Sequence, residues 1–90
     1  MLLEFYGRGC SHCRVMAPLV KKLEEEFGIT VDKYETWHDE RNTREMEKYD
    51  TGLCGGVPFF FNTATAEFIC GEASYEDLVR WARGTPEEKK

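Results

Sequence analysis

Two cysteines three positions apart carry the clearest chemistry in this chain. Cys10 and Cys13 follow the apolar run Leu2–Tyr6 and a glycine-punctuated turn, and they precede a helical pattern. In a first helical turn, residues at this spacing lie on the same side, with Cα atoms within the roughly 4.4–6.8 Å that a disulfide needs. The pair can therefore open and close with little backbone movement, which predicts a thiol–disulfide exchange site.

The two thiols are predicted to have different roles. Cys10 lies at the helix N-terminus, where the helix dipole and free amides favour a thiolate, so it is the expected nucleophile. Cys13, one turn further in, is the expected resolving thiol of a mixed disulfide. The bare motif leaves two alternatives open: a permanent disulfide, or half of a zinc site. Zinc held by Cys10, Cys13, Cys54 and a histidine would lack a second closely spaced pair.

Three neighbours of the cysteines are candidates for tuning them. His12 would place positive charge beside the reduced thiolate and make the disulfide more oxidising; the alternative is an exposed histidine with no role. Glu4 lies in an apolar strand, where burial would raise its pKa and suit it as a general base for Cys13. Lys33 on the neighbouring strand is its candidate partner. Alternatively, Glu4 points to solvent at a strand edge.

The other two cysteines, Cys54 and Cys70, are ambiguous. Four cysteines can form two structural disulfides in a secreted mini-protein, but the long helical patterns favour catalytic or metal-binding thiols in a reducing compartment. Cys54 precedes Pro58 in a turn-rich loop and is interpreted as an extra redox or regulatory thiol. Cys70, near a strand end, is interpreted as a core-facing buried thiol.

Hydrophobic periodicity predicts the elements that hold these residues. The first half is expected to form a strand over Met1–Tyr6, a helix over Cys10–Phe27 that is kinked at Pro18 and stopped by Gly28, and a strand over Ile29–Trp37. A weak exposed helix over Asp39–Tyr49 should follow, anchored by Met46 and Tyr49. The last part is expected to form a hairpin of Phe59–Asn62 and Ala66–Cys70, and then a helix that a Ser74–Asp77 capping box opens and Gly84 ends. The apolar face of the first helix comprises Val15, Met16, Leu19, Val20, Leu23 and Phe27. Trp37, Trp81 and the Phe59–Phe61 run are interpreted as core and edge aromatics.

Composition limits the class of protein. Ninety residues with 41% hydrophobic content predict one packed domain over residues 1–84 with a polar tail over 85–90. A net charge of −5 without a basic stripe argues against nucleic acid as partner. No apolar run approaches the roughly 20 residues of a membrane span, and the N-terminus lacks signal-peptide features. We therefore expect a monomeric cytoplasmic protein with no membrane partner.

The order β-α-β-α-β-β-α with Cys-x-x-Cys at the first helix resembles the thioredoxin superfamily, from Leu2 to Gly84. Its implied fold is a minimal, glutaredoxin-sized α/β domain, with a four-stranded mixed sheet flanked by three helices. Pro18 matches the family's helix-kinking proline, Val57-Pro58 its cis-proline loop, and Gly71 the glycine before the last helix. Glu4 and Lys33 match its buried acid and lysine. The chain departs from the family at Gly9, where thioredoxins have tryptophan, and at Ser11-His12, where they have Gly-Pro.

The resemblance implies a thiol–disulfide oxidoreductase that acts on protein disulfides, in electron transport and cell redox homeostasis. His before the second cysteine is similar to protein disulfide isomerase. No cofactor is implied beyond the redox-active disulfide, with glutathione as a possible co-substrate, and recycling would use a thioredoxin-reductase-like or glutathione system. The implied substrate-binding residues are Tyr6, Gly9, Ser11, Gly56, Val57, Pro58 and Gly71.

Two other functions stay open at this point. A glutaredoxin-like, glutathione-dependent reductase fits Arg8 and Val57-Pro58, but Cys70-Gly71-Glu72 replaces that group's glycine pair and adds a negative charge. A non-catalytic zinc-binding or adaptor module would keep the fold without turnover. The direction of electron flow, whether reductant or oxidant and isomerase, is also open.

Overall fold

The computed structural model describes residues 1–84, and the predicted polar tail over 85–90 lies outside the described residues. The expected order β-α-β-α-β-β-α is confirmed. The elements are β1 (Leu2–Tyr6), α1 (Ser11–Phe27), β2 (Val31–Glu35), α2 (Glu40–Glu47), β3 (Phe59–Asn62), β4 (Phe68–Cys70) and α3 (Tyr75–Arg83).

The four strands form one mixed sheet in the order β2-β1-β3-β4. β1 is parallel to β2 and antiparallel to β3, and β3 and β4 form the predicted antiparallel hairpin. β2 is shorter than expected, because the chain leaves the sheet after Glu35 and Trp37 falls in the following loop. Since β1 lies inside the sheet, Glu4 is not at an edge.

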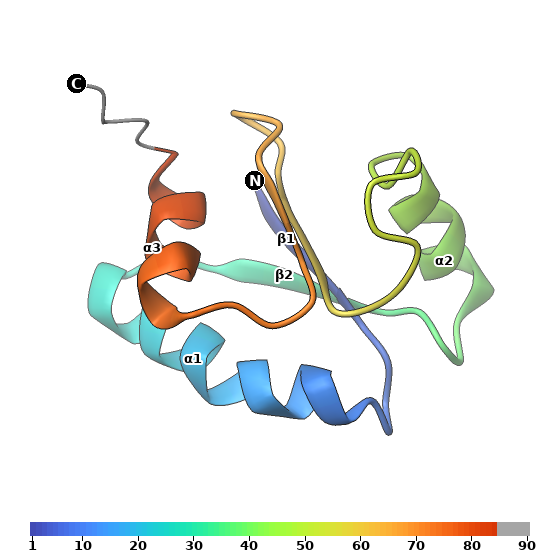
Figure 1. Cartoon of the computed structure of the whole chain (residues 1–90), viewed down its shortest axis with the longest axis horizontal. Coiled ribbons are helices and arrows are strands. Elements are labelled where there is room, and N and C mark those ends of the chain that lie inside the picture. Colours follow the sequence, from blue (N-terminus) through green and yellow to red (C-terminus); the bar gives the residue numbers. More distant parts are fainter. Residues whose placement is uncertain (85–90) are drawn as a thin grey trace.

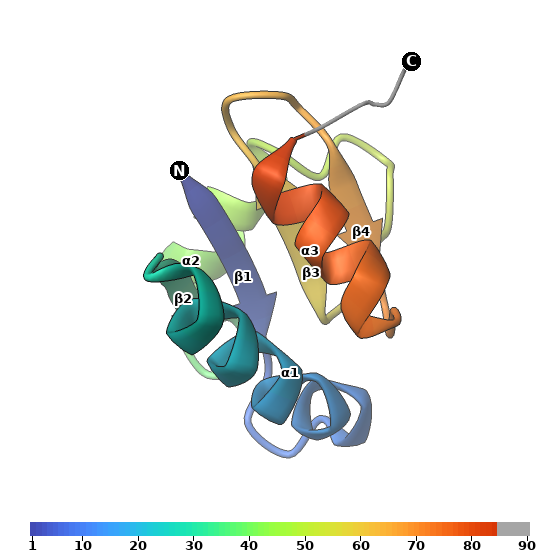
Figure 2. The same cartoon turned by 90° about the vertical axis from the view of Figure 1, so that its left-hand side faces the viewer.

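The alternation of side chains along β1 separates two hydrophobic clusters, one on each face of the sheet. Leu3 and Phe5 pack with Phe59 on the face that α2 covers. The opposite face packs against α1 and α3 through a cluster of Met16, Val20, Leu23, Val31, Phe60, Leu78 and Trp81. Figure 1 shows α2 on one side of the sheet and α1 with α3 on the other, and in Figure 2 α1 and α3 lie in front of the strands. Glu4 alternates with Leu3 and Phe5 and therefore faces α1.

Helix α1 begins after Cys10 and ends at Gly28, whose left-handed backbone (φ 64°) fits the predicted glycine stop. The helix continues through Pro18. The buried face of α1 is narrower than the predicted apolar face, because Val15 is 51% exposed and Phe27 39% exposed. Phe27 is the last residue of α1, where its ring meets the Arg83 guanidinium at 5.5 Å instead of the core.

Helices α2 and α3 contact the rest of the fold through residues that the sequence predicts. In α3, the Ser74 hydroxyl accepts a hydrogen bond from the amide of Asp77, and Trp81 packs edge-on against Phe60. Helix α2 buries none of its residues fully and rests on the sheet through Met46, followed by Tyr49. Within residues 1–84, no helix combines the length and apolar character that a membrane span requires.

Candidate redox site

Cys10 and Cys13 form a disulfide at the start of α1, with Cα atoms 5.2 Å apart. Cys10 is the N-cap residue of the helix: its Sγ accepts a hydrogen bond from the Cys13 amide at 3.1 Å. Its own amide donates to the carbonyl of Gly7 at 3.0 Å, which closes the preceding turn. Each cysteine is 6% exposed, so burial does not distinguish them, whereas the N-cap position singles out Cys10.

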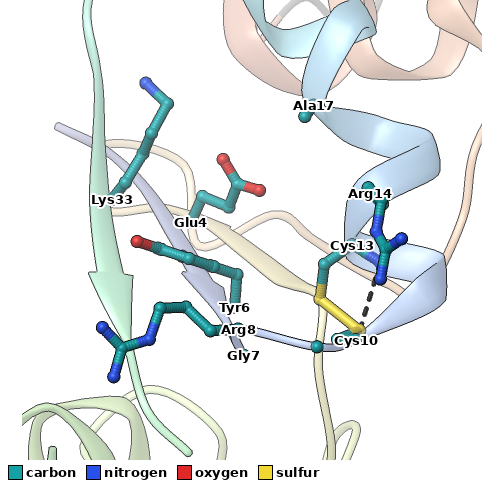
Figure 3. A pocket seen from close by; sticks show the side chains of 10 residues that line it. Glu4, Tyr6, Gly7, Arg8, Cys10, Cys13, Arg14, Ala17 and Lys33 are labelled. Carbon is teal, nitrogen blue, oxygen red and sulfur yellow. Dashed lines mark hydrogen bonds between the residues drawn. A yellow bond between two sulfur atoms is a disulfide. The ribbon is translucent and has the colours of Figure 1, made fainter. Parts of the chain in front are cut away.

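Behind the disulfide lies a pocket of about 370 Å³ between β1, β2 and α1. Figure 3 shows Glu4 reaching from β1 toward α1, between Lys33 on β2 and Cys13 on the helix. The pocket is lined by Glu4, Tyr6, Gly7, Arg8, Gly9, Cys10, Cys13, Arg14, Ala17 and Lys33. The structure thus brings the predicted acid, its candidate lysine partner and both cysteines into one cavity.

Glu4 is only 4% exposed, although it is ionisable. Desolvation by burial raises the pKa of Glu4 to about 7, while the nearby Lys33 charge opposes that rise and Glu24 adds to it. Near neutral pH the carboxyl group therefore exists in both protonation states. A group poised in this way can take a proton from a neighbouring thiol and return it.

Lys33 lies directly opposite Glu4 in the parallel β1–β2 register but bonds elsewhere. Its ammonium donates to a Glu24 carboxylate oxygen of α1 at 2.9 Å and to the Val31 carbonyl at 2.9 Å. The predicted direct Glu4–Lys33 pair is therefore replaced by a Lys33–Glu24 pair, and Lys33 acts on Glu4 only through its charge. Because the Lys33 ammonium bonds to Glu24 and not to Glu4, its charge only partly offsets the rise in the pKa of Glu4 that burial causes.

On its other side, Cys10 faces the loop before β3. The Val57–Pro58 peptide bond is cis, and the Val57 carbonyl oxygen lies 3.9 Å from Cys10 Sγ. Within residues 1–84, the amides of Gly56 and Val57 donate to no protein acceptor. This short stretch therefore presents unpaired backbone groups beside the disulfide.

A second, open pocket of about 320 Å³ lies along this stretch. It is lined by His12, Val57, Pro58, Gly71 and Glu72, so three separate segments form its walls. His12 Nδ1 contacts a Glu72 carboxylate oxygen at 2.6 Å across it. The histidine between the cysteines is thus joined to the segment that follows β4.

Five of the seven predicted substrate-binding residues line one of the two pockets. Tyr6 and Gly9 line the pocket behind the disulfide, whereas Val57, Pro58 and Gly71 line the open one. Ser11 and Gly56 line neither pocket, although both are chain neighbours of residues that do. The motif is therefore reachable from the Val57 side, with Glu4 on the opposite side.

Sequence reasoning missed the contacts that hold the turn before Cys10. Trp37, predicted as a core or edge aromatic, is 56% exposed, and its ring covers Gly7 so closely that a Cβ there would come within 2.3 Å of it. The Glu35 carboxylate accepts hydrogen bonds from the amides of Arg8 and His38. Burial alone would raise the pKa of Glu35, but these bonds and the His38 ring lower it to about 2. Gly9 could have indicated this contact, because it stands where thioredoxins have tryptophan and so leaves room for an aromatic ring from another segment.

The interpretation of Cys54 and Cys70 as separate thiols is wrong. They form a second disulfide, with Cα atoms 5.4 Å apart, that joins the loop before β3 to the end of β4. Cys70 is exposed and not core-facing, because β4 is an edge strand of three residues. Cys54 is half-buried against the Leu3 and Phe5 cluster. Since Cys54 is bonded to Cys70, it is not placed with Cys10 and Cys13 as the zinc alternative required.

A family model matches this chain. The model of the thioredoxin family matches residues 1–83, which is nearly the whole described chain. No curated protein matches the sequence. The match spans every element from β1 to α3, including both disulfides and both pockets.

Proposed function

The chain belongs to the thioredoxin family, and from that premise we propose that it is a thiol–disulfide oxidoreductase that exchanges its Cys10–Cys13 pair with disulfides in protein substrates. The observation that carries the proposal is Cys10 as the N-cap of α1 with Val57 beside it. A sulfur at a helix N-terminus is stabilised as a thiolate by the helix dipole and the amide of Cys13.

In the reducing direction, the Cys10 thiolate attacks one sulfur of a substrate disulfide. A mixed disulfide forms between Cys10 and the substrate, and the other substrate sulfur leaves as a thiolate that takes up a proton. Cys13 then loses its proton and attacks Cys10 Sγ, which releases the second substrate thiol and restores the Cys10–Cys13 disulfide. Two electrons pass from the protein to the substrate, and the oxidising direction is the reverse.

Glu4 supplies the proton transfer for the second step. It lines the same cavity as Cys13, and its pKa of about 7 lets it accept the thiol proton near neutral pH. The cavity of about 370 Å³ also leaves room for a water between the two groups. Lys33 modulates this acid through its charge while remaining bonded to Glu24.

An extended peptide is the ligand that suits the open pocket. The unpaired amides of Gly56 and Val57 and the Val57 carbonyl offer strand-like hydrogen bonds beside Cys10. Such main-chain bonding accepts many sequences, and it places a substrate cysteine next to the attacking sulfur. Glu72 at the pocket wall disfavours a carboxylate ligand, which argues for protein disulfides over glutathione as the preferred partner.

The experiment is disulfide trapping with a substrate protein such as insulin. Reduced protein should reduce insulin disulfides, and a Cys13→Ser variant should accumulate a mixed disulfide through Cys10 because the resolving thiol is missing. A Cys10→Ser variant should show no reduction and no adduct. Equal activity of the Cys10→Ser variant and the unaltered protein would contradict the proposal, as would stoichiometric zinc with no disulfide reduction.

A further inference from the structure

The second disulfide, Cys54–Cys70, lies outside the exchange mechanism above but next to the pocket that serves it. Cys54 is three residues before Val57, whose carbonyl lies 3.9 Å from Cys10 Sγ. Cys70 is two residues before Glu72, whose carboxylate contacts His12 at 2.6 Å. Each of the two cysteines is therefore within three residues of a residue that contacts the Cys10–Cys13 motif directly.

The disulfide joins two walls of the open pocket. One wall is Val57-Pro58, before and at the start of β3, and the other is Gly71-Glu72, after β4. The walls are also linked by one backbone hydrogen bond, from the Gly71 amide to the Pro58 carbonyl at 2.8 Å. The Cys54–Cys70 bond is the covalent link between them, with Cα atoms 5.4 Å apart.

The segment before Gly56 has an internal structure that does not depend on the disulfide. The Asp50 carboxylate accepts hydrogen bonds from the amides of Leu53, Cys54 and Gly55, so residues 50–55 form a self-contained turn. Gly55 has a positive φ of 80°, and Gly56 follows it without an amide acceptor in the part of the chain described. The two glycines form a hinge between this turn and Val57, and the disulfide ties the turn to β4.

We propose that Cys54–Cys70 is a second, reducible disulfide that positions the docking stretch Gly56-Val57, so that its reduction weakens the binding of protein substrates at Cys10 without removing the exchange chemistry. This inference rests on the proposed function. Cys54 and Cys70 are positioning residues, because they contact neither the substrate nor the reacting sulfurs. Without the bond, the turn over residues 50–55 moves at the glycine hinge, and the Val57 wall leaves its register with the Gly71 wall.

A small dithiol can reduce the Cys54–Cys70 bond. Its thiolate attacks the Sγ of the exposed Cys70, which forms a mixed disulfide and releases the half-buried Cys54 as a thiolate that takes up a proton. The second thiol of the dithiol then displaces Cys70, which leaves as a thiol. The reductant departs as a cyclic disulfide, having lost two electrons, and the protein gains two thiols.

The test compares the unaltered protein with a Cys54→Ser/Cys70→Ser variant on two substrates of different size. With a protein disulfide substrate, the variant should show a KM raised about tenfold and a largely retained kcat, which is within the usual range for coupling between sites. With a small aromatic disulfide, which needs no docking stretch, the rates should agree. Unchanged KM for the protein substrate would overturn the inference.

A matched control separates positioning from loss of stability. Val79→Ala removes a half-buried side chain of α3 that packs on the Met16 cluster, away from both pocket walls. This variant should lose stability yet keep the KM of the unaltered protein. A KM rise of equal size in Val79→Ala would show that instability alone explains the effect and would overturn the inference.

Amide hydrogen exchange tests the positioning step without requiring any turnover. Opening Cys54–Cys70, by the double substitution or by selective reduction, should accelerate exchange of the Gly71 amide and leave the β1 amides protected. This result would support the inference even if the unaltered protein reduced no protein disulfide, which would contradict only the proposed function. Unchanged exchange at Gly71 in both preparations would overturn the inference.

Discussion

The two disulfides of this protein differ in what surrounds them. Cys10–Cys13 spans three positions at the N-terminus of a helix, with an ionisable acid behind it and unpaired backbone groups beside it. Cys54–Cys70 spans 16 positions and joins a glycine-rich loop to an edge strand. The first lies where a thiolate is stabilised and can be attacked or attack, whereas the second lies where a cross-link restrains the chain. The proposed division, with exchange at the first disulfide and positioning at the second, therefore rests on where each bond lies in the fold and not on the bond itself.

The buried acid behind the first disulfide gives the largest expected effect. Glu4→Gln keeps the shape of the side chain but removes its proton transfer, so turnover should fall about a hundredfold. In the unaltered protein, the rate of the Cys13 step should change with an inflection near pH 7, which follows from the raised pKa of Glu4. Stopped-flow measurement of mixed-disulfide decay at several pH values gives both the rate and the inflection. An unchanged pH profile in Glu4→Gln would contradict the role of Glu4 as the proton acceptor.

The same substitution has a predicted effect on stability. The pKa of Glu4 is higher in the folded chain than in the unfolded one, so the unfolded state gives up its proton first. The stability of the unaltered protein should therefore decline as pH rises from about 4.5 to about 7, by on the order of 3 kcal/mol, and then level off. Glu4→Gln should abolish this decline in urea unfolding measured at several pH values.

The two disulfides are expected to contribute differently to stability. In the chain-entropy account, closing the longer Cys54–Cys70 loop stabilises the fold by about 3 kcal/mol, and closing the short Cys10–Cys13 loop by about 2 kcal/mol. Replacing both cysteines of a pair by serine should thus lower Tm more for the second pair than for the first. Calorimetry in the absence of reductant measures the order, and the reverse order would contradict a restraining role for Cys54–Cys70.

A smaller effect is expected at the turn that leads into Cys10. Gly7→Ala places a Cβ where the Trp37 ring lies, and the ring must move outward to accommodate it. We expect a loss of about 1–3 kcal/mol in unfolding free energy and a change in tryptophan fluorescence. Trp37→Ala combined with Gly7→Ala should recover part of that loss, because the clash is gone. Additive losses in the double variant would show that the two residues do not interact.

The smallest effect is expected at Glu72, which links the segment after the second disulfide to the motif of the first. Glu72→Gln removes a negative charge from the pocket beside Cys10, so the reduced thiolate should be favoured and the Cys10–Cys13 disulfide should become more oxidising. Because the His12–Glu72 pair is exposed, we expect a change of at most about fivefold in the equilibrium constant with glutathione. The change should shrink at high salt, and a less oxidising disulfide would contradict this reasoning.

The sequence was informative where chemistry depends on local spacing. The Cys-x-x-Cys pair, the glycine that ends α1, the Ser74 cap and the alternation of side chains along β1 all depend on near neighbours in the chain, and their placement follows from helix and strand geometry. The order of elements could be predicted for the same reason.

Contacts between distant segments could not be predicted in this way. The pairing of Cys54 with Cys70 depends on the β3–β4 hairpin bringing residue 70 opposite residue 59, which the separate sequence patterns do not encode. Lys33 bonds to Glu24 and not to Glu4 because the Glu24 carboxylate of α1 lies at the start of β2, where it also accepts from the Val31 amide. Trp37 covers Gly7 because β2 ends at Glu35. Each of these is a tertiary contact between side chains with several possible partners.

The two disulfides are proposed to have different roles during exchange, and thiol trapping during turnover measures that difference. The protein would turn over an insulin substrate with a dithiol reductant, be quenched at intervals with an alkylating reagent, and be mapped peptide by peptide. We expect Cys10 and Cys13 to become labelled within the first turnover, while Cys54 and Cys70 become labelled more slowly, at a rate set by the dithiol concentration and not by insulin turnover. Labelling of Cys54 and Cys70 at the same rate as Cys10 and Cys13 would contradict this division of roles.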